Sequence, residues 1–261
     1  MKTKPIFLNL TLLALLAGCS GNSLLGDPNI TGTTATLAIA GTHHLENGNA
    51  LVPHADGTKT FTNDLGYEIV LEEAAVNWKT LRLLSSGEDP ECEGGNDPKL
   101  EINRSENLLD EDLLAHVLAE HEIPRVAYCS YEIELAPGLI TVQASKYHAE
   151  ENHVGGHEPI TESFYLTGSW SQGGIGGEFH FHSTESFTVE GIFHSAEEEE
   201  GPHPFHFHEG ESEKQILFGI AYDRLFQGID FQTADAETLS EKVKENFHHA
   251  IHQHLGAIHE D

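Results

Sequence analysis

The chain has 261 residues, among them 43 Asp or Glu, 13 Lys or Arg and 19 His, and its formal net charge is −30. This charge argues against nucleic-acid binding, which needs a basic surface, and against adsorption to anionic lipid. A dense negative field raises the local concentration of cations, although an acidic surface also serves solubility alone.

The N-terminus predicts an export signal rather than folded structure. Lys2 and Lys4 precede an apolar run at residues 6–16, which is too short for an ordinary membrane span. Residues 16–19 read L-A-G-C, which resembles the bacterial lipobox. The resemblance implies cleavage before Cys19 and acylation of its thiol, with palmitate as a typical acyl chain; an ordinary signal peptide is the alternative.

We therefore expect a signal peptide at 1–18, a Gly-, Asn- and Ser-rich tether at 19–33 and one folded domain at 34–261. Cleavage would remove two lysines and leave 11 basic against 43 acidic residues, a formal charge of −32. Ser20, rather than Asp, follows the lipobox cysteine. By similarity to Gram-negative lipoproteins, this favours a lipid anchor in the outer membrane, on either the periplasmic or the outer surface.

Two cysteines remain in the mature chain. An oxidising compartment favours a disulfide between Cys92 and Cys129. Two cysteines cannot form a zinc site made of thiolates alone, so any metal site must use His and carboxylate ligands.

Hydrophobic alternation and turn residues predict a mainly β fold, a β-sandwich or open barrel with two peripheral helices. The expected strands are 34–40, 61–72, 76–84, 126–135, 139–148, 164–170, 178–183, 186–194 and 215–222. The strands 126–135 and 139–148 should form a hairpin across Ala136-Pro137-Gly138. One helix is expected at 108–121 and another after Asp235, each with apolar residues every four positions.

The motif F-H-F-H occurs twice, at 179–182 and 205–208. Because side chains alternate along a strand, His180 and His182 should share one face of the sheet, opposite a buried aromatic face. Imidazole is a common metal ligand, so this pair predicts a metal site. The candidate further ligands are His148, His194, His206 and His208. Solvated strand histidines are the alternative.

The second motif follows a Glu-rich stretch and predicts a mobile loop that contributes ligands. Secondary metal candidates are His43, His44, His153, His157, His203, His248, His249 and His252. On a helix, His248 and His252 would be four residues apart and able to chelate, although histidines also suit a helix C-terminus electrostatically. His116 and His121 are interpreted as surface residues.

The stretch 179–194 resembles the zinc region of α-carbonic anhydrases, where an H-x-H strand is followed by a third His on the next strand. The interval from His182 to His194 is much shorter than in that family, and its other signature stretches are absent. The likeness is therefore confined to about fifteen residues.

The overall layout is similar to bacterial outer-membrane metal-binding lipoproteins that accompany zinc or copper uptake receptors. That resemblance implies binding, buffering or delivery of zinc without catalysis, with an outer-membrane metal receptor as partner. Zinc is expected rather than Cu(I), because the chain has one Met and no free thiol, while Cu(II) and nickel remain open.

Two alternatives stay open at this point. One is a zinc-dependent hydrolase or lyase with a three-His site, in which Glu178 or Glu185 would act as general base. The other is a structural or adhesive sandwich in which the histidines have no role in metal binding.

Overall fold

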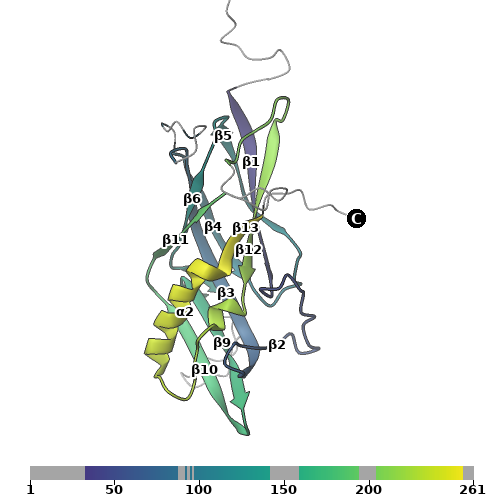
Figure 1. Ribbon diagram of the computed structural model, residues 1–261, viewed down its shortest axis with the longest axis vertical. Coiled ribbons are helices and arrows are strands. Elements are labelled where there is room, and N and C mark those ends of the chain that lie inside the picture. The colour runs from purple at the N-terminus through teal and green to yellow at the C-terminus, as the bar shows by residue number, and fades with distance from the viewer. Residues whose placement is uncertain are drawn as a thin grey trace, which may run out of the picture.

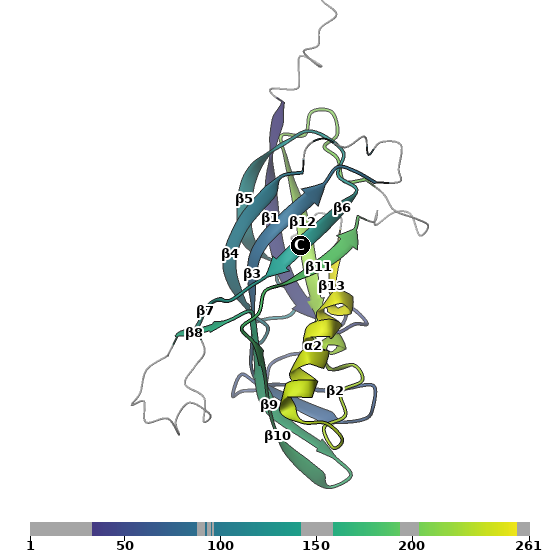
Figure 2. The same cartoon turned by 90° about the vertical axis from the view of Figure 1, so that its left-hand side faces the viewer.

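Two larger β-sheets, a two-stranded ribbon and a C-terminal helix form the folded part of the chain (Figures 1 and 2). The computed structural model describes residues 33–87, 92, 95, 97–141, 159–193 and 204–254. The strands are β1 (Thr34–His44), β2 (Lys59–Thr62), β3 (Glu68–Leu84), β4 (Lys99–Asn107), β5 (His116–Pro124), β6 (Ser130–Leu135), β7 (Gly138–Thr141), β8 (Pro159–Glu162), β9 (Phe164–Gln172), β10 (Ile175–Ser183), β11 (Phe187–Ile192), β12 (Glu213–Ala221) and β13 (Ile251–His254). The helices are the 3₁₀ turn η1 (Arg224–Phe226) and α2 (Ala236–Ala250).

The smaller sheet has the order β13-β12-β1-β5, with β1 parallel to β12 and antiparallel to β5. The larger sheet follows the path β10-β9-β3-β6-β11, and its 17-residue strand β3 also pairs with β2 and β4. β7 and β8 form a separate ribbon that projects from the side of the molecule in Figure 2. The mainly β prediction is confirmed, with several sheets packed together as in a β-sandwich.

The core lies between the two sheets. Trp78 of β3 lies with its ring centroid 6.2 Å from that of Phe218 of β12, and Tyr131 of β6 lies 5.0 Å from Phe218. These side chains are almost fully buried. Removing a side chain the size of Phe218 from water contributes about 1.5–3 kcal/mol, so such contacts between the sheets are a main source of stability.

The predicted final helix is confirmed as α2. Asp235 caps it, because its carboxylate accepts a hydrogen bond of 2.8 Å from the amide of Thr238. Leu239, Val243 and Phe247 form the buried face. Figures 1 and 2 show α2 beside β10. Phe179 and Phe181 of β10 line a hollow together with Ala236 and Leu239 of the helix.

The predicted helix at 108–121 is wrong. Leu113 has a left-handed backbone (φ 64°), and its amide donates to the carbonyl of His43 at 3.0 Å, so a helix cannot pass through it. The chain then becomes β5 and pairs antiparallel with β1. The apolar spacing was misleading, because Leu113 and Val117 are about half exposed whereas Leu118 enters the core.

The predicted hairpin of 126–135 with 139–148 is also wrong. β6 pairs with β3 and β11, whereas β7 pairs with β8. The chain crosses β3 at this point, and the Asn77 side-chain amide donates to the carbonyl of Ala136 at 2.6 Å. A Cβ at Gly138 would collide with that Asn77 amide, so glycine permits the crossing that separates β7 from β6.

Cys92 and Cys129 are joined in a disulfide, with Cα atoms 6.2 Å apart. Cys129 lies just before β6, and its amide donates to the carbonyl of Leu84 at the end of β3. The disulfide therefore ties the acidic loop after β3 to the entry of β6 rather than to a hairpin. Within the described residues, neither helix has the length and apolar character needed to cross a membrane.

Candidate metal centre

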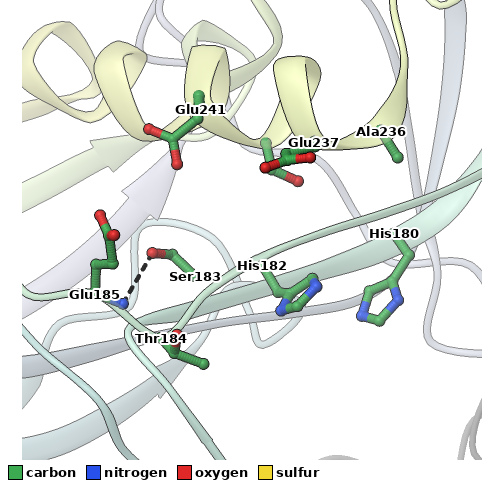
Figure 3. Close-up of a pocket in the computed structure, with 9 residues that line it drawn as sticks. His180, His182, Ser183, Thr184, Glu185, Ala236, Glu237 and Glu241 are labelled. Carbon is green, nitrogen blue, oxygen red and sulfur yellow. Dashed lines mark hydrogen bonds between the residues drawn. The ribbon is translucent and has the colours of Figure 1, made fainter.

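The first F-H-F-H lies on β10 as expected. Phe179 and Phe181 are buried in the core, while His180 and His182 share the opposite face and pair with Thr167 and Tyr165 of β9. Figure 3 shows the two imidazoles side by side on the strand, on the side away from α2. The alternation predicted from the sequence is therefore confirmed.

The two rings on β10 are not arranged as a chelate. Their centroids are 4.7 Å apart and their planes are inclined by only 22°, so the rings are stacked. A metal bound by two imidazoles must lie close to both ring planes. Two nearly parallel, stacked planes do not meet near the rings, so His180 and His182 must rotate before they can bind one ion together.

A carboxylate supports the outer ring of this pair. Nδ1 of His182 lies 3.3 Å from Oε1 of Glu162, and the second oxygen of this buried carboxylate has no hydrogen-bond partner among the described residues. A carboxylate behind one imidazole nitrogen directs the other nitrogen outward, which is the common arrangement behind metal-ligating histidines. Sequence analysis did not identify Glu162, because no spacing rule connects it with His182.

The expected further ligands are not brought to this pair within the described part of the chain. His148 and His194 lie outside the described residues. His206 and His208 follow Phe205, which forms a bridge with Tyr128 beside β6. His180 is level with Glu73 of β3 through Thr167 of β9, whereas Ser130 at the start of β6 pairs with Leu84. The distance along β3 between these two levels, from Glu73 to Leu84, is roughly 35 Å.

The second F-H-F-H is anchored, which differs from the mobile loop that the sequence predicted. Phe205 is 1% exposed and exchanges two backbone hydrogen bonds with Tyr128, of 2.7 and 2.8 Å. The ammonium of Lys214 lies 5.2 Å from the Phe205 ring centroid, and the Arg125 guanidinium 5.8 Å from that of Phe207. These contacts cover 204–208; the Glu-rich stretch before it, with His203, lies outside the described residues.

A second pair of imidazoles is formed by His44 at the end of β1 and His252 on β13. Their Nε2 atoms are 3.1 Å apart, their ring planes are inclined by 71° and their centroids are 4.9 Å apart. His44 is 4% exposed and His252 is half-buried. The two residues are 208 positions apart in the chain.

The second nitrogen of each ring faces a carbonyl. Nδ1 of His44 lies 2.5 Å from the carbonyl oxygen of Leu45, and Nδ1 of His252 lies 3.2 Å from that of Ala250. Carbonyls only accept hydrogen bonds, so each Nδ1 carries the proton and donates. The two Nε2 atoms point toward each other, which is the orientation that imidazoles take when Nδ1 is held by a carbonyl and Nε2 is directed at a metal.

These distances agree with a shared ion. A metal about 2.05 Å from both Nε2 atoms would subtend an angle of roughly 98°, between the values for octahedral and tetrahedral sites. The ring centroids would then lie about 4.8 Å apart, against the 4.9 Å observed. A head-on N–H···N hydrogen bond of the same length would place them about 5.4 Å apart.

The two rings meet across an intervening strand. β12 lies between β1 and β13, with Ala221 opposite His44 and Gly219 opposite His252. Neighbouring strands are about 4.8 Å apart, so the histidines must reach toward each other over β12. They can do so because Gly219 has no side chain and Ala221 has only a methyl group.

Charged groups clamp the two segments that carry these histidines. The Arg224 guanidinium pairs with the carboxylate of Glu46 and donates at 3.0 Å to the carbonyl of His249. Asp223 accepts from the Glu46 amide at 2.8 Å, and burial raises the pKa of this carboxyl. Arg224 thus connects the turn after His44 with the helix end before His252, where a cation is also favoured by the helix dipole.

A buried ionic network fixes the other side of β1 at the same level. The ring of His43 is fully buried, with Nδ1 3.3 Å from Glu106 and Nε2 3.4 Å from Asp112. The ammonium of Lys59 pairs with Asp112 and donates to the carbonyl of Leu108 at 2.8 Å. Burial lowers the pKa of Lys59, and the Asp112 carboxylate opposes that shift.

The remaining secondary candidates that the structure describes do not add ligands to the His44–His252 pair. His248 and His249 are exposed on α2, and His153 and His157 lie outside the described residues. The expected helical spacing to His252 is wrong, because α2 ends at Ala250 and the chain enters β13. Across the described ranges, no group of three or more His, Cys, Asp or Glu could hold a metal.

The carboxylates proposed as general bases fit that role poorly. Lys244 donates to Glu185 at 2.6 Å and lowers the pKa of that carboxyl, and Glu178 is exposed. Burial instead raises the pKa of Glu73 to about 6, despite hydrogen bonds from Thr167 and Tyr165. Glu73 of β3 lies opposite Thr167 of β9, which in turn lies opposite His180 of β10. No sequence spacing predicted that these three residues are aligned across the sheet.

No protein-family model, no curated protein and no solved structure matches this chain. The function must therefore be argued from the residues themselves.

Proposed function

We propose that this protein is a lipid-anchored envelope protein that binds a divalent transition metal, with zinc as the expected ion. The observation that carries the proposal is the His44–His252 pair, whose Nε2 atoms converge at 3.1 Å while each Nδ1 faces a carbonyl. Two imidazoles suit zinc, Cu(II) and nickel, and the remaining positions would be filled by water or by ligands from a partner.

The rest of the proposal draws on the sequence. The lipobox-like residues 16–19 support acylation of Cys19 and an outer-membrane location, and the net charge of −30 supports attraction of cations. His180 and His182, backed by Glu162, would form a weaker second site that requires ring rotation. His148 keeps its predicted role as an additional ligand there. A site with two histidine ligands suits capture and delivery to a metal receptor, without catalysis.

Metal titration by calorimetry tests the proposal on protein produced without residues 1–19. Zinc should bind the wild type with one tight site, and His44→Ala or His252→Ala should weaken that site by more than about 100-fold, because a single imidazole does not chelate. The matched control is His248→Ala/His249→Ala, which removes two exposed histidines from α2. Unchanged zinc affinity in His252→Ala would refute the assignment.

The weaker site has a separate readout. His180→Ala/His182→Ala should remove a second, weaker zinc-binding step and leave the tight one unchanged. The single variant His148→Ala tests whether His148 is a further ligand of this weaker site. Mass spectrometry of the Cys19 peptide from the full chain tests the anchor: an unmodified thiol would overturn that part of the proposal. A tight ion with an exchangeable bound water and hydrolase activity would favour the zinc enzyme instead.

A further inference from the structure

Two adjoining hollows follow the outer edge of β10 beneath the start of α2, and together we call them the β10–α2 groove. Their volumes are about 310 and 300 Å³, and both are lined by His180 and Ala236. β10 is the terminal strand of its sheet path, so the groove runs along a sheet edge. Figure 3 shows the first hollow between the strand and the helix.

One part of the groove is aromatic. Trp170, Phe179, Phe181 and Phe231 line the second hollow, and the Trp170 and Phe231 rings stack at 5.3 Å with planes inclined by 12°. Trp170 and Phe231 are only partly buried. Phe231 also stacks on Phe181, so the rings cover one another's faces and the walls attract mainly apolar groups, such as the methylene groups of a ligand.

The other part is acidic. Glu185, Glu237 and Glu241 line the first hollow, and Figure 3 shows these carboxylates around the space between strand and helix. Lys244 is paired with Glu185 at 2.6 Å and with Glu241 at 3.1 Å, so it offsets one of these negative charges. Three carboxylates and one ammonium leave a net charge of −2, to which Glu178 adds at the aromatic end.

The N-terminus of α2 does not change the preference of the groove for cations. The positive end of a helix dipole favours anions. Here the Asp235 carboxylate already caps the Thr238 amide, and Glu237 occupies the first turn. The local field at the groove is therefore negative, and anionic ligands are excluded.

We propose that the β10–α2 groove binds an extended organic cation of the polyamine class, independently of the His44–His252 pair. Its methylene groups would lie against the aromatic walls, one ammonium group would lie beside Glu178, and a second would lie among Glu237, Glu241 and Glu185. The methylene chain between them would cross the groove beside His180. A single small inorganic cation would not extend over both hollows and would gain nothing from the aromatic lining.

Calorimetric titration of the metal-free protein with spermidine tests the assignment. The wild type should bind it saturably, and Glu237→Gln/Glu241→Gln should weaken binding about tenfold, equivalent to loss of two exposed charge contacts. The matched control, Glu190→Gln/Glu213→Gln, removes the same charge from exposed positions outside the groove and should change affinity less than about twofold.

Four outcomes would overturn the proposal. Two concern spermidine itself: binding without saturation, or an equal loss of affinity in both double variants, which would show a general effect of net charge. The third is binding of a lysine-rich peptide at the groove without binding of free spermidine, which would make a partner's side chains the source of the cation. Binding of butylamine as tightly as spermidine would refute the need for two cationic groups.

Discussion

The His180–His182 pair and the His44–His252 pair differ in what surrounds them. The first lies on an edge strand, and the His182 side chain is 46% exposed. The second lies where β1, β12 and β13 meet, with His44 buried and each Nδ1 facing a carbonyl. An H-x-H motif on a strand therefore places two histidines next to each other but does not orient their ring nitrogens toward a common point. The packing of distant segments orients the nitrogens of His44 and His252, and no sequence motif marks that pair.

The largest effect is expected from breaking the buried ionic network around His43, which fixes the end of β1 that also carries His44. Lys59→Met leaves the buried Asp112 carboxylate, which also accepts from Tyr222 at 2.7 Å, without its ammonium partner. Breaking a buried ion pair in this way should lower the free energy of unfolding by about 3–5 kcal/mol in urea denaturation. Lys99→Met, which removes the exposed partner of Glu134, should cost less than about 1 kcal/mol. Equal losses would mean that the network adds nothing to this end of β1.

A second test separates the two rings and leaves both histidines in place. Gly219→Val puts a branched side chain on the face of β12 that the imidazoles cross, so their Nε2 atoms can no longer approach to 3.1 Å. Zinc affinity measured by calorimetry should fall about 100-fold, or about 2.7 kcal/mol. His180→Ala/His182→Ala should leave the tight site within about threefold. If Gly219→Val binds zinc like the wild type, the rings do not share an ion.

The smallest expected effect is the pH dependence of stability that comes from Glu73, which lies near the His180–His182 pair. The pKa of Glu73 is raised to about 6 by burial, so its neutral form is favoured in the folded state. The folded state then binds this proton more tightly than the unfolded state, and stability falls as pH rises from about 4.5 through 6. Glu73→Gln should gain about 1 kcal/mol relative to wild type at pH 7.5, after allowance for solvent screening, and nothing at pH 4.5. Urea unfolding at both pH values measures this; a difference that does not vary with pH would contradict the assignment.

The features that sequence analysis predicted well are local ones. Alternation along 178–183 placed Phe179 and His180 on opposite faces, and Asp235 identified the start of α2. The false helix at 108–121 had a genuine four-residue spacing, but pairing of β5 with β1 and the backbone of Leu113 overrode it. Long-range pairing decides such cases, and spacing cannot reveal it.

The site shows the same limit more sharply. His44 and His252 were both secondary candidates, but nothing in the sequence linked them, because their approach depends on β12 lying between β1 and β13. Gly219 reads in sequence as an ordinary strand glycine, and only the sheet order gives it a role. Glu162 and Glu73 likewise become relevant through their neighbours on adjacent strands.

The short strand β13 gives the proposed metal site a mechanical meaning. Within the described residues, four positions of β13 pair with β12, so a force on the segment after His254 would act on this short pairing directly. An ion held between His44 and His252 would cross-link two residues that are 208 positions apart in the chain. A force on β13 would then act on the two metal–nitrogen bonds. Metal occupancy would then set the force at which the domain begins to open, and the same ion would shield β13 from proteases that attack fraying ends.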